Sequence, residues 1–90
     1  REIEVAIDSM DAVAEVAVIG VPDDATGEAV TALVVAVPGV ALSVGDVAAY
    51  CAERLARFKC PSVIRIVDAL PHSATGKVAK GRLRAVYGDE

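Results

Sequence analysis

Two apolar runs joined by a cluster of turn-forming residues constrain the fold of this chain most. Residues 13–21 are rich in β-branched side chains, and residues 28–37 form a second apolar run with an alternating set, Thr31, Leu33, Val35 and Val37. β-Branched side chains favour strands, and the Pro, Asp, Thr and Gly residues of Pro22–Gly27 favour a turn. We therefore expect two strands that end at Pro22 and at Pro38-Gly39 and that pair antiparallel.

Helical signals precede and follow these strands. Residues 2–10 fit a strand or a helix by apolar spacing, but the acidic residues Glu2 and Glu4 favour the start of a short helix. A second helix is expected to begin at Ser43, which forms an imperfect capping box with Asp46. Apolar residues recur at spacings of three and four along this helix and predict its buried face: Val44, Val47, Cys51, Leu55 and Phe58.

The remainder of the chain completes a small mixed domain. Pro61 stops the second helix, residues 63–67 predict a third strand, residues 70–76 a loop and residues 79–87 a closing helix. The order α-β-β-α-β-α predicts an α+β fold, in which one sheet of about three strands has helices packed against it.

Composition limits the class of protein. The 90 residues suffice for one small domain, and the net charge of −4 argues against nucleic-acid binding, which needs clustered cations. No apolar run reaches the roughly 20 residues that span a bilayer, so no transmembrane segment is expected. Cys51 and Cys60 stand apart without metal-ligand spacing, which predicts reduced thiols, no metal site and a cytoplasmic location. Because the chain opens on Arg1 rather than Met, we expect a piece of a longer protein.

The run from Leu70 to Arg84 carries the clearest chemical signal, because Lys77 lies in a loop of small residues before a basic helix. The loop is not a phosphate-binding P-loop, since Pro71 and Val78 occupy positions that require Gly and Ser or Thr. A lysine can nevertheless stabilise negative charge that develops in a transition state if water is excluded. The residues alone leave this role and that of a solvated surface lysine both open.

Four motifs in sequence order carry a resemblance. The chain resembles the C-terminal subdomain of the adenylate-forming acyl-CoA synthetases, a family that includes luciferases and the adenylation domains of peptide synthetases. The matching segments are Glu2-Ile3-Glu4, then Val16–Asp23 with Gly27-Glu28, then Leu55 with Phe58-Lys59 and Pro61, and finally Leu70-Pro71, Thr75-Gly76-Lys77, Lys80 and Leu83-Arg84.

The resemblance implies roles for particular residues. The lysine that matches Lys77 is catalytic and contacts the ATP α-phosphate and the substrate carboxylate, and Gly76 supplies backbone freedom beside it. The resemblance places Gly20 beside the pantetheine channel, although turn chemistry explains this region equally well. It places Phe58 and Lys59 near the CoA nucleotide, but Phe58 also ends the apolar face of the second helix, which favours core packing for it. Some relatives carry basic residues where this chain has Cys60 and Ser62, which leaves fewer cations for the CoA phosphates.

The resemblance also implies a function for the whole protein. Residues 1–90 are expected to be the C-terminal lid of an ATP-dependent acid–CoA ligase acting on fatty or related carboxylic acids, and to be inactive alone. The large N-terminal domain and the hinge are absent; that domain would be the lid's partner and would hold ATP, Mg²⁺ and the acyl pocket. The alternatives are an adenylation domain that loads a carrier protein and a non-catalytic lid or binding module.

Overall fold

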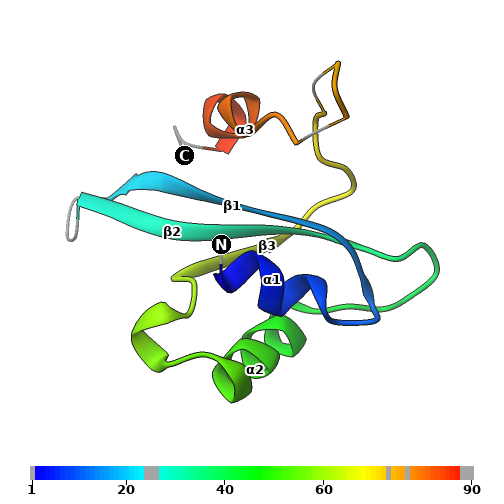
Figure 1. The fold of residues 1–90 in the computed structure, drawn as a ribbon, viewed down its shortest axis with the longest axis vertical. Helices are drawn as coiled ribbons and strands as arrows, with labels where there is room; N and C mark the ends of the chain where they lie inside the picture. Colours follow the sequence, from blue (N-terminus) through cyan, green and yellow to red (C-terminus); the bar gives the residue numbers. More distant parts are fainter. Residues whose placement is uncertain (1, 24–26, 73, 77, 88–90) are drawn as a thin grey trace.

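The computed structural model describes residues 2–23, 27–72, 74–76 and 78–87. The elements follow in the order α1 (Glu2–Asp8), β1 (Val13–Asp23), β2 (Gly27–Ala36), α2 (Val44–Arg54), a 3-10 turn (Arg57–Lys59), β3 (Val63–Ile66) and α3 (Lys80–Tyr87). Helices α1 and α2 lie on one face of the sheet, and α3 lies on the other (Figure 1). This order of helices and strands confirms the predicted α+β fold.

Strands β1 and β2 form the predicted antiparallel pair. Val16 lies opposite Val34, and the pairing continues until Asp23 lies opposite Gly27, so the prediction that β1 ends at Pro22 is wrong. The reason is that β1 is an edge strand whose Val18 N–H points away from β2, toward the Glu4 carboxylate. Backbone N–H groups alternate in direction along a strand, and Pro22 comes four residues after Val18. The N–H that Pro22 lacks would therefore also point to the free edge, where proline is tolerated.

Strand β3 pairs with the other side of β2 and runs parallel to it. Thr31 lies opposite Val63 and Val34 opposite Ile66, and the sheet order is β1-β2-β3. A parallel neighbour needs a crossover rather than a tight turn, and α2 lies within that connection. Strand β2 is therefore the central strand.

The core consists of two clusters, one on each face of β2. Ala32 and Val34 pack with Ile7 of α1 and with Val47 and Cys51 of α2. Leu33 and Val35 pack on the opposite face, against a cluster completed by Ala17, Ile19, Leu70 and Leu83. Leu33 and Val35 of the predicted alternating set therefore share one face, and the other face of β2 is buried as well, because helices cover both.

Helix α2 begins as predicted and ends earlier than predicted. Ser43 Oγ accepts from the Asp46 N–H at 3.1 Å, and Asp46 Oδ2 accepts from the Ser43 N–H at 3.1 Å, so the capping box is confirmed. The helix ends at Arg54, and Leu55 is extended with φ −119° and ψ 149°. The helical spacing that aligned Phe58 with Leu55 is thereby lost, and Phe58 is 85% exposed instead of packed in the core.

The cysteines are free thiols in different environments: Cys51 is buried in the core beneath α2, and Cys60 is half-buried after the 3-10 turn. Among the described residues, no helix has the length and apolar character that a membrane crossing requires.

Candidate functional site

The segment that carries Lys77 is a loop closed at its base, and we call residues 71–79 the lysine loop. The Ala79 N–H donates to the Pro71 carbonyl at 2.8 Å, and His72 and Val78 form an antiparallel bridge. Leu70 before the loop and Leu83 after it are 4% and 1% exposed and belong to the same core cluster. Both ends of the loop are therefore fixed to the α3 face of the sheet.

The tip of the lysine loop is exposed, and Gly76 has a positive φ of +85°. Only glycine adopts such angles routinely, so the backbone freedom predicted for Gly76 is used directly before the lysine. Lys77 itself lies outside the described residues. Its two neighbours are described: Gly76 is at the exposed tip, and Val78 is in the bridge that closes the stem.

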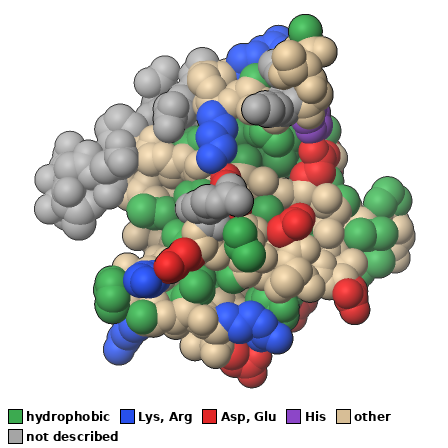
Figure 2. Space-filling model, viewed as in Figure 1, with side chains coloured by type: hydrophobic (Ala, Val, Ile, Leu, Met, Phe, Trp, Pro, Cys, Tyr) green, Lys and Arg blue, Asp and Glu red, His purple; other side chains and the backbone are tan. Residues whose placement is uncertain are grey.

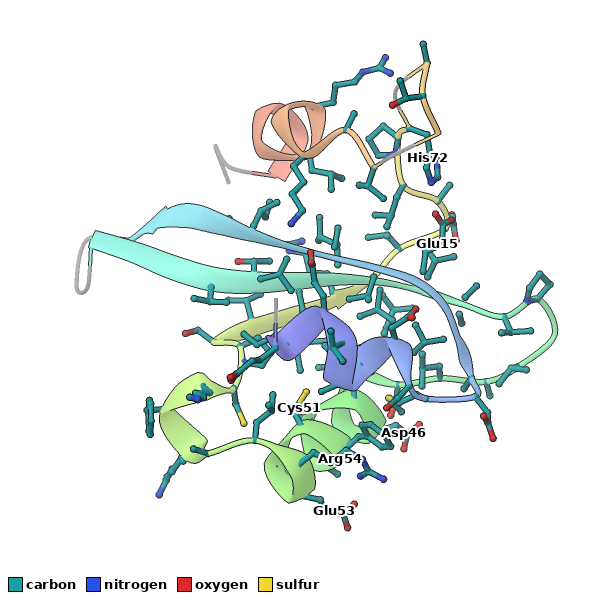
Figure 3. The ribbon with its side chains drawn as sticks, in the orientation of Figure 1. Glu15, Asp46, Cys51, Glu53, Arg54 and His72 are labelled. Carbon is teal, nitrogen blue, oxygen red and sulfur yellow. The ribbon has the colours of Figure 1, made fainter. Side chains whose placement is uncertain are left out.

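A side-chain pair attaches the first strand of the loop stem to the sheet. His72 Nε2 lies 2.6 Å from Glu15 Oε1, and both side chains are about one third exposed, 38% and 35%. Figure 3 shows the two side chains facing one another between the lysine loop and β1, and Figure 2 shows the purple imidazole against an acidic side chain. Sequence reasoning missed Glu15; the available signal was that it is the lone charged residue in the apolar run 13–21.

Phe58 and Lys59 form a second exposed feature, at the corner that follows α2. Lys59 Nζ lies 3.0 Å from Glu2 Oε2 and 5.9 Å from the centroid of the Phe58 ring. An exposed aromatic face beside an ammonium group can stack with a base and attract a phosphate. The structure thus favours a surface role for Phe58 over the core-packing alternative.

Two open hollows meet at Lys59. The larger, of about 700 Å³, lies between α1 and the end of α2, and its lining is mostly apolar: Glu2, Val5, Ala6, Ser9, Arg54, Leu55, Ala56 and Lys59. The smaller, of about 460 Å³, includes Phe58 and Val30. Gly20 pairs with Val30 in the β1–β2 register, so Gly20 is one strand away from this hollow.

The predicted site residues therefore fall into two groups on opposite faces of the sheet. Val78 of the lysine loop and Leu70, which precedes the loop, pack on the cluster beneath α3. The Phe58–Lys59 corner instead adjoins Leu55 and Cys60, which pack on the cluster beneath α1 and α2. Figure 1 shows the sheet between the two groups. Gly76 belongs with the first group, and Gly20 lies near the second.

Within the described part of the chain, no three His, Cys, Asp or Glu side chains gather where they could hold a metal ion. The ionic groups at both features pair with one another instead, as Glu15 does with His72 and Glu2 with Lys59.

Comparison with known proteins gives consistent results. A family model described as the AMP-binding enzyme C-terminal domain matches residues 2–77, so the match ends on Lys77. A 3-(7a-methyl-1,5-dioxo-octahydro-1H-inden-4-yl)propanoyl:CoA ligase from Rhodococcus jostii is 55% identical over 83 residues, which cover 92% of this chain and 16% of the ligase. The fatty acid–acyl-carrier-protein ligase ScoC from Streptomyces coeruleorubidus is 39% identical and is covered to 17%, with 98% of this chain aligned.

Solved structures agree with these relatives. A fatty acyl CoA synthetase from Mycobacterium tuberculosis superposes with a TM-score of 0.90 and 42% identity, over 98% of this chain and 17% of that protein. The chain therefore spans about a sixth of the length of the curated relatives that it matches.

Proposed function

The chain belongs to the family of AMP-binding enzyme C-terminal domains, and on that premise we propose that residues 1–90 are the C-terminal lid of an ATP-dependent acid–CoA ligase. The full enzyme would join a fatty or related carboxylic acid to CoA through an acyl-adenylate. The observation that carries the proposal is that the family match covers residues 2–77, a span that includes Lys77 and most of a loop whose two ends are fixed to one face of the domain.

In the first half-reaction we assign Lys77 as the catalytic residue. A carboxylate that attacks the α-phosphorus of ATP brings two anions together, and their repulsion raises the barrier. An ammonium group placed between them, in a site closed to water, stabilises the charge of the transition state. The closed stem of the lysine loop supports this role, since the bridge between His72 and Val78 holds the residue that follows Lys77 in the sequence.

We assign the second half-reaction, the formation of the thioester, to the opposite face of the domain. A lid that rotates about a hinge can withdraw Lys77 and present the Phe58–Lys59 corner to CoA. Phe58 would stack on the adenine and Lys59 would face a phosphate, with Gly20 near the pantetheine arm. The exposure of Phe58 and its position on the face away from the lysine loop support this assignment.

The proposal names substrates and partners of the complete enzyme. ATP, CoA and the carboxylic acid are its substrates, its partner domain is the large N-terminal domain joined through the hinge, and Mg²⁺ belongs to that large domain. We place the enzyme in the cytoplasm, and we expect the isolated domain to be inactive because ATP and the acyl group bind elsewhere.

A carrier protein is the second candidate for the acyl acceptor. The similarity of this chain to the fatty acid–acyl-carrier-protein ligase supports this candidate. Both acceptors deliver a pantetheine thiol, but only CoA carries an adenine nucleotide that Phe58 could stack on. The two functions therefore predict different effects of a change at Phe58.

Two substitutions in the full-length enzyme test the proposal together. Lys77→Ala should slow adenylate formation about 10²–10³-fold, the usual cost of removing one transition-state donor, and leave thioester formation from supplied acyl-adenylate unchanged. Phe58→Ala should leave adenylation unchanged and raise the KM for CoA roughly tenfold, as expected for a lost stacking contact. Pyrophosphate release measures the first step, and thioester formation from acyl-adenylate measures the second.

Because Phe58 is exposed, its replacement carries little stability cost that could imitate a binding effect. Equal losses in both half-reactions for Lys77→Ala would contradict the two-face assignment. An unchanged KM for CoA in Phe58→Ala, together with efficient transfer to a carrier protein, would favour the second candidate.

A further inference from the structure

One carboxylate joins three elements at the free edge of the sheet. Glu4 Oε2 accepts from the Val18 N–H of β1 at 2.9 Å and lies 2.8 Å from Lys80 Nζ of α3. Figure 1 shows α1 and α3 on opposite faces of the sheet. Glu4 is on α1, so its side chain links these two helices across the edge strand β1. We call this arrangement of Glu4, Val18 and Lys80 the edge clasp.

Among the ion pairs between described residues, the edge clasp has the most shielded carboxylate, whereas its Lys80 side chain is 43% exposed. The Glu4 side chain is 25% exposed, whereas Glu2 and Glu53, which pair with Lys59 and Arg54, are 64% and 75% exposed. Burial acts to raise the pKa of Glu4, but the Lys80 hydrogen bond, the Val18 N–H and the Lys80 charge outweigh it, so the pKa is lowered. Glu4 is therefore ionised at neutral pH and carries the negative charge that faces Lys80.

The position of Lys80 connects the edge clasp to the lysine loop. Lys80 is the first residue of α3 and comes three residues after Lys77. Val78 and Ala79 lie between them and form the second strand of the loop stem through the bridge to His72 and the bond to Pro71. Lys80 follows these stem residues directly, so a shift of the start of α3 moves the second strand of the stem with it.

The two sides of the loop stem thus have separate attachments to the rest of the domain. The Glu15–His72 pair attaches the first side to β1, and the edge clasp attaches the second side to β1 and α1. The larger consequence is expected from the edge clasp, because it also fixes the start of α3 and reaches across the sheet to the opposite face.

We propose that Glu4 is a positioning residue for adenylation, which acts through Lys80 to fix where the lysine loop delivers its ammonium group. The proposal rests on the function proposed above and names a residue of that same reaction step. It makes α1 part of the adenylation machinery, although α1 lies on the face away from the lysine loop. A hydrogen-bonding carboxylate that only protected the sheet edge would have no such effect on one half-reaction.

The test compares substitutions that separate the two contacts of Glu4 in the full-length enzyme. Glu4→Gln keeps an oxygen for the Val18 N–H but removes the charge that faces Lys80, and Lys80→Met removes the cation but keeps the aliphatic stem. Either change should lower kcat for adenylate formation about tenfold. A loss of this size corresponds to an interaction free energy that is usual for two residues in contact. Thioester formation from supplied acyl-adenylate should stay unchanged.

The double variant and the conservative variant make the test specific. Glu4→Gln with Lys80→Met together should be no slower than either alone, because both remove the same contact. Lys80→Arg restores a cation and should regain most of the rate. Glu53→Gln, which breaks an exposed pair on α2, serves as the matched control and should leave both steps unchanged.

Three outcomes decide the matter. Selective loss of adenylation that is non-additive and rescued by Lys80→Arg supports the positioning role. Equal losses in both half-reactions, or normal adenylation in both single variants, overturn it and leave Glu4 with a purely structural role. Normal adenylation in Lys77→Ala would instead refute the proposed function, so the two failures are distinguishable.

Discussion

Gly76 offers the sharpest test of whether the conformation of the lysine loop matters for catalysis. Its φ is +85°, and a Cβ added there would meet no atom within 4 Å. Gly39, in the turn after β2, has a φ of +83° and equally open surroundings. An alanine at either position therefore suffers backbone strain without a steric clash, and the two sites form a matched pair.

The expected magnitude follows from the backbone angle. A left-handed conformation costs an L-residue about 1–2 kcal/mol relative to glycine, which corresponds to a factor of about 5–30 in an equilibrium. Ala74, Thr75 and Gly76 are all exposed, so little core packing opposes a change of conformation at the loop tip. Gly76→Ala should therefore reduce the population of the native loop, and with it the adenylation rate, by up to that factor.

The assay is the comparison of the two half-reactions in the full-length enzyme, with a thermal melt of each variant. Gly76→Ala should slow pyrophosphate release and spare thioester formation from acyl-adenylate. Gly39→Ala should lower stability by a similar amount and alter neither step selectively. Gly76→Asn should recover part of the rate, because Asn tolerates positive φ better than Ala.

Two results would refute this reasoning. If both glycine variants slowed adenylation equally, the effect would be one of general stability. If Gly76→Ala adenylated at the normal rate, the positive φ beside Lys77 would have no catalytic consequence.

Two further predictions concern ionisable groups. Burial, and then the nearby Cys60, raise the pKa of the Cys51 thiol. Iodoacetamide should therefore alkylate the half-buried Cys60 first and reach Cys51 only when the protein unfolds. Peptide mass spectrometry measures the order of alkylation, and equal rates for the two thiols in the native protein would contradict the prediction. The pKa of Glu4 lies below its ordinary value of 4.5, so its ionised form stabilises the fold above that value, and this contribution is lost as pH falls through the folded-state pKa. In urea unfolding, the free energy of unfolding should be larger for the unmodified protein than for Glu4→Gln near neutral pH, and this difference should shrink below pH 4.5. A difference that does not change with pH would show that the charge of Glu4 does not stabilise the fold.

Local patterns predicted those parts of the fold that depend on residues near one another in the chain. The capping box of Ser43 and Asp46 acts over three residues, and the β1–β2 hairpin joins adjacent runs. The local patterns missed those features that a distant element decided. Burial of both faces of β2 depends on α3 as well as α1 and α2, and the early end of α2 leaves Phe58 exposed despite its helical spacing.

The candidate site divides in the same way. The sequence located the lysine loop, because small residues, Gly76 and a following helix are local features. It did not reveal Glu15 or Glu4 as the residues that attach this loop to the sheet. His72 and Glu15 are 57 residues apart, and no periodicity or cap relates them.

The residues by themselves determined the class of the domain and the loop in which Lys77 lies, since strand propensity, turns and caps act over a few neighbouring residues. Tertiary packing alone decided which faces were covered, that β3 runs parallel to β2, and that a carboxylate on α1 reaches the start of α3 around an edge strand. The physical reason is that burial and ion pairing depend on distance in space, which the chain sets only after its helices have packed on both faces of the sheet.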